Sequence, residues 1–136
     1  MQAEDEGNVQ IETESDIAVA RRAIRDVATR LGFGATETAR IVTAASELGR
    51  NVFKYAGRGA MQWRAVSNGE ARGLELRFED HGPGIPDINQ ALREGYSTGK
   101  GLGMGLPGAK RLMDEMDIQS VAGEGTTVIV RKWQRR

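Results

Sequence analysis

Apolar residues recur at helical spacing in two segments of the N-terminal half of the chain. In the first segment they are Ile17, Ala20, Ile24, Val27, Ala28 and Leu31. In the second they are Ile41, Ala45, Leu48 and Val52. This period is typical of amphipathic helices that bury one face in a core. Ser15 or Asp16 is expected to cap the first helix, and Gly32 and Gly34 are expected to end it. The second helix is expected to start near Thr36 and to end at the glycine turn of residues 57–59.

Short runs with alternating or β-branched residues predict strands in the remaining segments. These runs cover residues 9–12, 61–66, 74–78, 117–121 and 126–130. Asn68-Gly69 joins the second and third runs and is a strong signal for a β-hairpin. A turn at residues 123–125 joins the last two runs, and a third helix is predicted over residues 105–116.

The order of these elements is strand, two helices, hairpin, glycine-rich segment, helix, hairpin. Because tight turns connect neighbouring strands, the sheet is expected to be mixed and mostly antiparallel, with the helices packed on one face. The fold class is therefore α+β, a two-layer α/β sandwich. We expect residues 1–136 to form a single domain.

Composition and charge exclude several classes of function. The chain holds 19 basic and 19 acidic residues, so no net charge attracts it to nucleic acid or to an anionic membrane. It has no cysteine, which excludes disulfides and thiol chemistry. The acidic N-terminal segment does not resemble a signal peptide, and no stretch approaches the roughly 20 apolar residues of a membrane span. We therefore expect a cytoplasmic protein that binds neither nucleic acid nor membrane.

Glycine is abundant, with 18 residues concentrated in the second half of the chain. Residues 103–108 match the dinucleotide pattern G-x-G-x-x-G, but no strand precedes them and too little chain follows for a βαβ unit. A Walker loop is excluded because Lys100 is followed by Gly101, where a magnesium-binding Ser or Thr is required. The backbone N–H groups of glycines before a helix can still bind a phosphate group, and Lys100 can add a positive charge. The alternative is a glycine-rich linker without a ligand.

A second candidate for ligand binding is Asp80, which directly follows a predicted strand and precedes Gly82 and Gly84. A carboxylate at this position can point from a rigid element into a cleft and accept a hydrogen bond from the exocyclic amine of adenine. The alternative is an aspartate that only starts a turn. His81, the single histidine, is expected to be solvated or to line a pocket rather than to catalyse.

The third candidate is the pair Glu47 and Asn51 on the second predicted helix. The two residues are one helical turn apart, so their side chains emerge on the same side, next to the apolar stripe. An amide oxygen beside a carboxylate suits a magnesium ion and a hydroxyl group that must lose its proton. The E-x-x-x-N spacing alone also fits an ordinary solvated helix face. The order of the three candidates along the chain is more specific than any one of them.

With these motifs the chain resembles the GHKL family of ATP-binding domains, which includes gyrase B, Hsp90, MutL and histidine kinases. Glu47-x-x-x-Asn51 matches the N-box of the family, residues 80–84 match the G1 box and residues 101–105 match the G2 box. Thr126 matches a threonine that lies near the adenine in that fold. The resemblance covers nearly the whole chain.

Length and histidine content narrow the resemblance to the small serine kinases that regulate bacterial sigma factors. Gyrase B, Hsp90 and MutL are much longer, and a histidine kinase needs an acceptor histidine outside the nucleotide turn. Residues 95–98 and 105–115 resemble the stressosome switch kinases more closely than the anti-sigma factor kinases. The resemblance implies an ATP-dependent serine/threonine kinase that phosphorylates a STAS-domain partner and, when released, activates a PP2C-type phosphatase.

The resemblance also implies a role for each matched residue. Glu47 would be the general base, Asn51 the Mg²⁺ ligand and Asp80 the residue that reads the adenine of ATP. The remaining nucleotide-binding residues implied are Gly82, Gly84, Ile85, Thr98, Lys100, Gly101, Leu102, Gly103, Met104, Gly105 and Thr126. Two alternatives stay open: a nucleotide-binding anti-sigma or sequestering module that acts by protein binding without phosphotransfer, and a self-contained ATPase.

Overall fold

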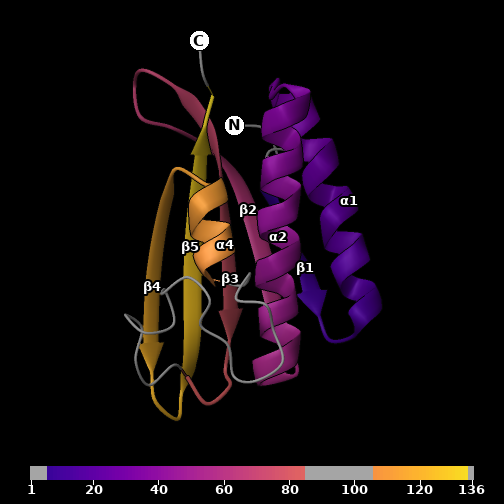
Figure 1. The fold of residues 1–136 in the computed structure, drawn as a ribbon, viewed down its shortest axis with the longest axis vertical. Helices are drawn as coiled ribbons and strands as arrows, with labels where there is room; N and C mark the ends of the chain where they lie inside the picture. The colour runs from indigo at the N-terminus through magenta and orange to yellow at the C-terminus, as the bar shows by residue number, and fades with distance from the viewer. Residues whose placement is uncertain (1–5, 85–105, 135–136) are drawn as a thin grey trace.

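The computed structural model describes residues 6–84 and 106–134. In chain order the elements are β1 (Glu6–Ile11), α1 (Glu14–Leu31), α2 (Ala35–Ala56), β2 (Gly59–Ser67), β3 (Arg72–Asp80), α4 (Leu106–Leu112), β4 (Glu115–Val121) and β5 (Gly125–Trp133). The strands form one five-stranded sheet in the order β1-β2-β3-β5-β4. Each pair of neighbouring strands is antiparallel. The helices lie on one face of this sheet (Figure 1), so the predicted α+β two-layer sandwich is confirmed.

The core lies between the sheet and the two long helices, and it contains the apolar stripes predicted from the sequence. Every predicted stripe residue of α1 and α2 is buried. On the sheet the largest fully buried side chains include Phe78, Met61 and Leu76. Helix α1 ends at Leu31, and the next residue, Gly32, caps it with a φ of 98°, in the left-handed region that favours glycine. Of the described helices, none is sufficiently long and apolar to cross a membrane.

The start of α1 differs from the expectation that Ser15 or Asp16 precedes the helix as its cap. The N-cap residue is Thr13, and Asp16 lies inside the first turn. The Asp16 carboxylate accepts hydrogen bonds from the backbone N–H groups of Glu12 and Thr13, at 2.9 and 3.0 Å. These bonds lower the pKa of Asp16, because they stabilise its charged form. Asp16 therefore stabilises the start of the helix from within it.

The predicted third helix is shorter than expected: α4 ends at Leu112 rather than at Met116. The chain joins the sheet directly after Met113, because the N–H of Asp114 donates to the carbonyl of Arg131 at 2.9 Å. The Asp114 carboxylate in turn accepts from the N–H of Trp133 at 2.8 Å. These contacts with β5 end the helix, and β4 begins two residues earlier than predicted.

The face of the sheet opposite the helices carries a charged cluster. Glu75 on β3 is 7% exposed and lies between Arg64 of β2 and Arg131 of β5, with Nε–oxygen distances of 2.7 and 2.8 Å. Burial raises the pKa of Glu75, but the hydrogen bonds from the two arginines outweigh it and leave the pKa below its ordinary value. Glu75 is thus charged at neutral pH and joins three neighbouring strands.

Candidate functional site

Asp80 and Thr126 lie at the end of the two layers where α2, the helix of Glu47 and Asn51, reaches its C-terminus. At this end β3 finishes at Asp80, β5 begins and α2 reaches its C-terminus, as Figure 1 shows. In the strand register Asp80 lies opposite Gly59 on one side and opposite Thr126 on the other. Directly opposite residues share a face of the sheet, so Asp80 and Thr126 lie on the face that packs against the helices.

Asp80 both starts a turn and keeps an oxygen available. Its Oδ1 accepts a hydrogen bond from the N–H of Gly82 at 2.9 Å, the geometry of an aspartate-started turn. Across the described ranges no hydrogen bond to Oδ2 is formed. The two interpretations of Asp80 are therefore compatible, because the turn uses one oxygen and fixes the direction of the other.

The turn after Asp80 is held between α2 and the β4–β5 connection. A Cβ atom at Gly82 would lie 2.6 Å from the Cβ of Ala56, the last residue of α2. Gly84 has a φ of 82°, and a Cβ there would lie 2.6 Å from the carbonyl oxygen of Val121. The carbonyl of Pro83 accepts from the N–H of Gly123 at 2.8 Å. Both glycines are therefore required by packing within the chain, a reason that the sequence did not reveal.

Thr126 is buried at the start of β5 and shares a hydrogen bond with a residue that the sequence reasoning missed. Its Oγ1 lies 2.9 Å from the Oγ of Ser120 on β4. Ser120 also donates to the carbonyl of Gly125 at 3.2 Å. When Ser120 makes that bond, the Thr126 hydroxyl donates to Ser120 and keeps its lone pairs as acceptors. The alternation of apolar Met116 and Ile118 with polar residues along β4 is the sequence signal that would have placed Ser120 on the inner face.

Glu47 and Asn51 lie one turn apart on α2, as predicted, and both are partly buried. The Glu47 side chain is 22% exposed, and its Oε2 lies 3.2 Å from Nη1 of Arg50. Sequence reasoning missed this ion pair, although the i, i+3 spacing could have indicated it. An exposed pair of this kind contributes only about 0.2–0.5 kcal/mol. A ligand or a partner can therefore replace Arg50 beside Glu47 at little cost.

Helix α4 is fixed against α2 by a buried lysine of β5. Lys132 is 3% exposed. Its Nζ donates to the carbonyl of Leu112, the last residue of α4, at 2.9 Å. The same Nζ lies 3.0 Å from Oε1 of Glu37, in the first turn of α2, and 3.7 Å from Oδ1 of Asp114. One cation thus caps α4 and links both helices to the sheet.

Replacing Lys132 with methionine should lower the free energy of unfolding by about 2–3 kcal/mol, because it leaves Glu37 and the Leu112 carbonyl without their cation. The expected loss of unfolding free energy is no larger than this, because Glu37 is 28% exposed and keeps contact with water when Lys132 is replaced. Urea denaturation measures the change, and Lys110→Met, at an exposed position of α4, is the matched control. Equal stability of the two variants would contradict this role of Lys132.

Several predicted nucleotide-binding residues lie outside the described residues. They are Ile85, Thr98, Lys100, Gly101, Leu102, Gly103, Met104 and Gly105. The described site therefore comprises Glu47 and Asn51 on α2, Asp80 with its glycine turn, and Thr126.

Comparisons with known proteins place this arrangement in a family. Residues 11–132 match the model of the histidine kinase-like ATPase domain. The chain is 52% identical over 131 residues to the serine/threonine-protein kinase RsbT of Bacillus subtilis, covering 96% of this chain and 98% of that protein. It is 31% identical over 120 residues to an anti-sigma F factor of Thermoanaerobacter, covering 84% and 82% of the two chains.

A solved structure agrees with the fold. The crystal structure of the RsbU and RsbW domains of a Mycobacterium tuberculosis protein superposes with a TM-score of 0.65 at 18% identity. The match covers 96% of this chain and 33% of that one, so the chain spans about a third of the larger protein.

The sheet order, the helices on one face and the match over residues 11–132 define a class: the chain belongs to the histidine kinase-like ATPase domain family. Membership of this family implies that the chain uses ATP. Its identity along nearly the full length of RsbT places it more narrowly. It is a protein kinase of the RsbT type, related to the anti-sigma F factors.

Proposed function

We propose that the chain transfers the γ-phosphate of ATP to a serine or threonine of a STAS-domain partner in a partner-switching pathway that controls a sigma factor. The observation that carries this proposal is that Asp80, at the end of β3, lies close to the C-terminal part of α2, the helix that carries Glu47 and Asn51: a Cβ atom on Gly59 would lie 2.7 Å from Cγ1 of Val52 and 3.2 Å from the Cβ of Asp80. The identity to RsbT supports the acceptor type, and the relation to anti-sigma F factors supports the pathway. Activation of a PP2C-type phosphatase by the released kinase is part of the same proposal.

Asp80 and Thr126 suit an adenine ring by the acceptor lone pairs that they keep. Oδ2 of Asp80 is an acceptor without a hydrogen bond from the described part of the chain, and adenine presents an amine donor. The turn through Gly82 holds this oxygen in place before a ligand arrives. Thr126 lies opposite Asp80 in the register, so its hydroxyl is available on the same face of the sheet.

Asn51 is the candidate ligand for Mg²⁺. In the residues that the structure describes, no group of three His, Cys, Asp or Glu side chains could hold a metal ion. Mg²⁺ commonly keeps several waters and binds through one or two protein oxygens and the phosphates of a nucleotide. A single amide oxygen beside the nucleotide therefore suits Mg²⁺ and does not suit a metal that needs a closed set of protein ligands.

Glu47 is the candidate general base. When bound, ATP supplies the phosphoryl group and Mg²⁺ offsets its negative charge. The Glu47 carboxylate would take the proton from the acceptor hydroxyl of the partner protein as that oxygen bonds to the γ-phosphorus and the bond from phosphorus to the β–γ bridging oxygen breaks, with ADP as the leaving group. Arg50 lies beside this carboxylate and limits the directions in which it can point. Most of the acceleration comes from placing the hydroxyl in line with the phosphoryl group.

The Arg50–Glu47 ion pair also favours a second candidate function. A carboxylate held by a neighbouring arginine can be structural, and the chain would then bind a nucleotide and sequester its partner without phosphotransfer. An assay of phosphate transfer separates the two functions.

With labelled ATP, the chain alone should release phosphate to water slowly, and a purified STAS-domain protein should become labelled on serine or threonine. The partner is needed because its docking places the hydroxyl beside Glu47. Mass spectrometry of the labelled partner identifies the acceptor residue. Rapid hydrolysis without the partner would favour a self-contained ATPase, and label on the chain itself would contradict the kinase proposal. Tight binding of the partner without transfer would favour the sequestering module.

A further inference from the structure

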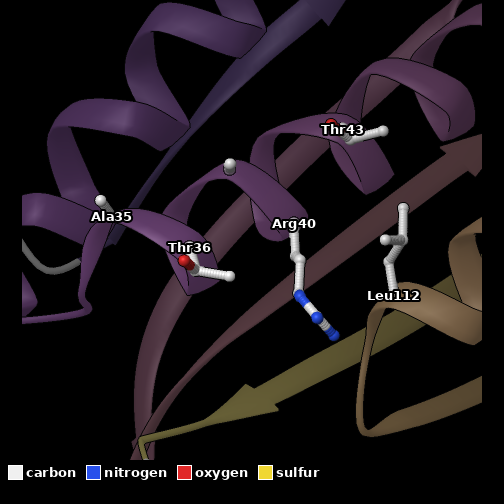
Figure 2. Close-up of a pocket in the computed structure, with 6 residues that line it drawn as sticks. Ala35, Thr36, Arg40, Thr43 and Leu112 are labelled. Carbon is white, nitrogen blue, oxygen red and sulfur yellow. The ribbon is translucent and has the colours of Figure 1, made fainter.

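A groove lies between α2 and α4, away from the end of the sandwich that holds Asp80. Its volume is about 410 Å³, and it is lined by Ala35, Thr36, Ala39, Arg40, Thr43 and Leu112. Figure 2 shows Arg40 extending from α2 on the side where Leu112 of α4 faces that helix. The α2 residues of the groove are all exposed, and apart from Arg40 they are small. A floor of small side chains allows the backbone of another protein to approach α2 closely.

Arg40 supplies an exposed positive charge at this groove, and no residue in the described ranges 6–84 and 106–134 forms an ion pair with it. The same two helices carry the basic residues Arg50, Lys54, Lys110 and Arg111. Their acidic residues are Glu37, paired with Lys132, and Glu47, paired with Arg50. The surface of α2 and α4 is therefore basic, although the whole chain has no net charge.

The groove lies on the same side of α2 as the candidate base. Arg40 and Glu47 are seven residues apart, which is close to two helical turns, so their side chains emerge in nearly the same direction. At 1.5 Å per residue their positions differ by about 10 Å along the helix axis. Thr43 lies between them on the same side and lines the groove. A segment that occupies the groove and continues past Thr43 along this side of α2 therefore reaches Glu47.

We propose that this groove is the docking site for the phosphoacceptor protein, with a carboxylate of that protein bound to Arg40. The inference rests on the proposed kinase function and adds the feature by which the substrate is selected. A distance of about 10 Å corresponds to about three residues of extended chain or about seven residues of helix. The partner therefore carries an aspartate or glutamate at one of these spacings from its acceptor serine or threonine.

The test is Arg40→Glu, with a purified STAS-domain protein as the probe. The variant should raise the KM for this protein, and its Kd measured by calorimetry without turnover, by about 10-fold or more, because like charges then meet in the interface. Its kcat at saturating partner and its affinity for ATP should stay close to the wild-type values. Affinity of the wild-type chain for the partner should fall with added salt more steeply than that of Arg40→Glu.

Arg25→Glu is the matched control, since it makes the same charge change on the exposed face of α1, outside the groove. A second test blocks the groove with a larger side chain: Ala39→Leu fills its floor, and Ala18→Leu, at an exposed position of α1, is the control. Only the groove variants should weaken partner binding. Replacing the proposed acidic residue of the partner by lysine should restore binding to Arg40→Glu.

The two proposals fail in different ways. If the wild-type chain transfers no phosphate to the STAS-domain protein, the proposed function is wrong, while calorimetry still tests docking. If Arg40→Glu and Ala39→Leu bind the partner as the wild-type chain does, the docking groove is wrong even where transfer occurs. A loss of binding that Arg25→Glu shares equally would also contradict it, because the effect would then reflect total charge.

Discussion

Replacing Glu47 with alanine should reduce kcat for phosphate transfer by about 10²–10⁴-fold, the usual contribution of a positioned general base. Affinity for ATP should stay within a small factor of the wild-type value, because Glu47 is proposed to act on the acceptor hydroxyl rather than on the nucleotide. Single-turnover transfer from labelled ATP to the STAS-domain protein, together with calorimetric titration of ATP, measures both quantities.

Two further variants separate chemistry from structure at this turn of α2. Arg50→Gln removes the ion pair at Glu47 but keeps the carboxylate, so it should retain most of the transfer rate. Asn51→Ala should lose Mg²⁺-dependent ATP binding as well as transfer, because its amide oxygen is the proposed metal ligand. If Glu47→Ala and Arg50→Gln lose activity equally, Glu47 acts only through its ion pair. If Glu47→Ala and Asn51→Ala lose affinity alone, Glu47 is structural.

Stability should change little in Glu47→Ala, which makes the kinetic result interpretable. The side chain is partly exposed and its ion pair with Arg50 is of a kind worth only about 0.2–0.5 kcal/mol. Alanine also has the highest helix propensity, so α2 is retained. A large loss of unfolding free energy would show that Glu47 contributes to packing beyond the contacts described.

The features predicted best from the sequence depend on neighbours along the chain. Helix periodicity places Ile24 and Leu48 in the core, because each helix has a single face that can be buried. The hairpin at Asn68 follows from local chemistry too, since its Oδ1 accepts from the N–H groups of Glu70 and Ala71 at 2.9 and 2.8 Å. The fold class could be predicted because such local signals also fix the order of the elements.

Features that depend on distant residues were predicted less well. The end of α4 is set by contacts of Asp114 with Arg131 and Trp133, which lie at least 17 positions further along the chain. Helical periodicity continues past Leu112, so the pattern alone extended the helix too far. Lys132, in a strand near the C-terminus, gave no local sign that it would cap α4.

In the candidate site, too, local features could be predicted from the sequence and long-range features could not. The spacing of Glu47 and Asn51 follows from helix geometry, and α2 confirms that they lie one turn apart. The position of Asp80 opposite Thr126 required the pairing of β3 with β5, which are separated by the whole segment between residues 80 and 125. Motif order supplied that information only through the family resemblance, because no periodicity in the chain encodes the register between these strands.

Asp80→Asn should weaken ATP binding by about 10- to 100-fold, the effect of losing a hydrogen bond to a charged acceptor. Asparagine can keep the turn, because its Oδ1 can accept from the N–H of Gly82 as the carboxylate does. Its NH₂ group then replaces Oδ2 and faces the adenine amine with a second donor. If the amide flips, the NH₂ group faces the donor of Gly82 instead, so either orientation leaves two donors opposed.

Calorimetric titration of ATP measures this loss, and circular dichroism with thermal unfolding checks that Asp80→Asn remains folded. Glu79→Gln is the matched control, because it removes one charge from the preceding residue on the opposite face of the sheet, where Glu79 pairs with Arg77. The wild-type chain should also prefer ATP to GTP, since guanine presents an acceptor where adenine presents its amine. Unchanged ATP affinity in the variant, or equal affinity of the wild-type chain for GTP, would contradict the role of Asp80 as the reader of adenine.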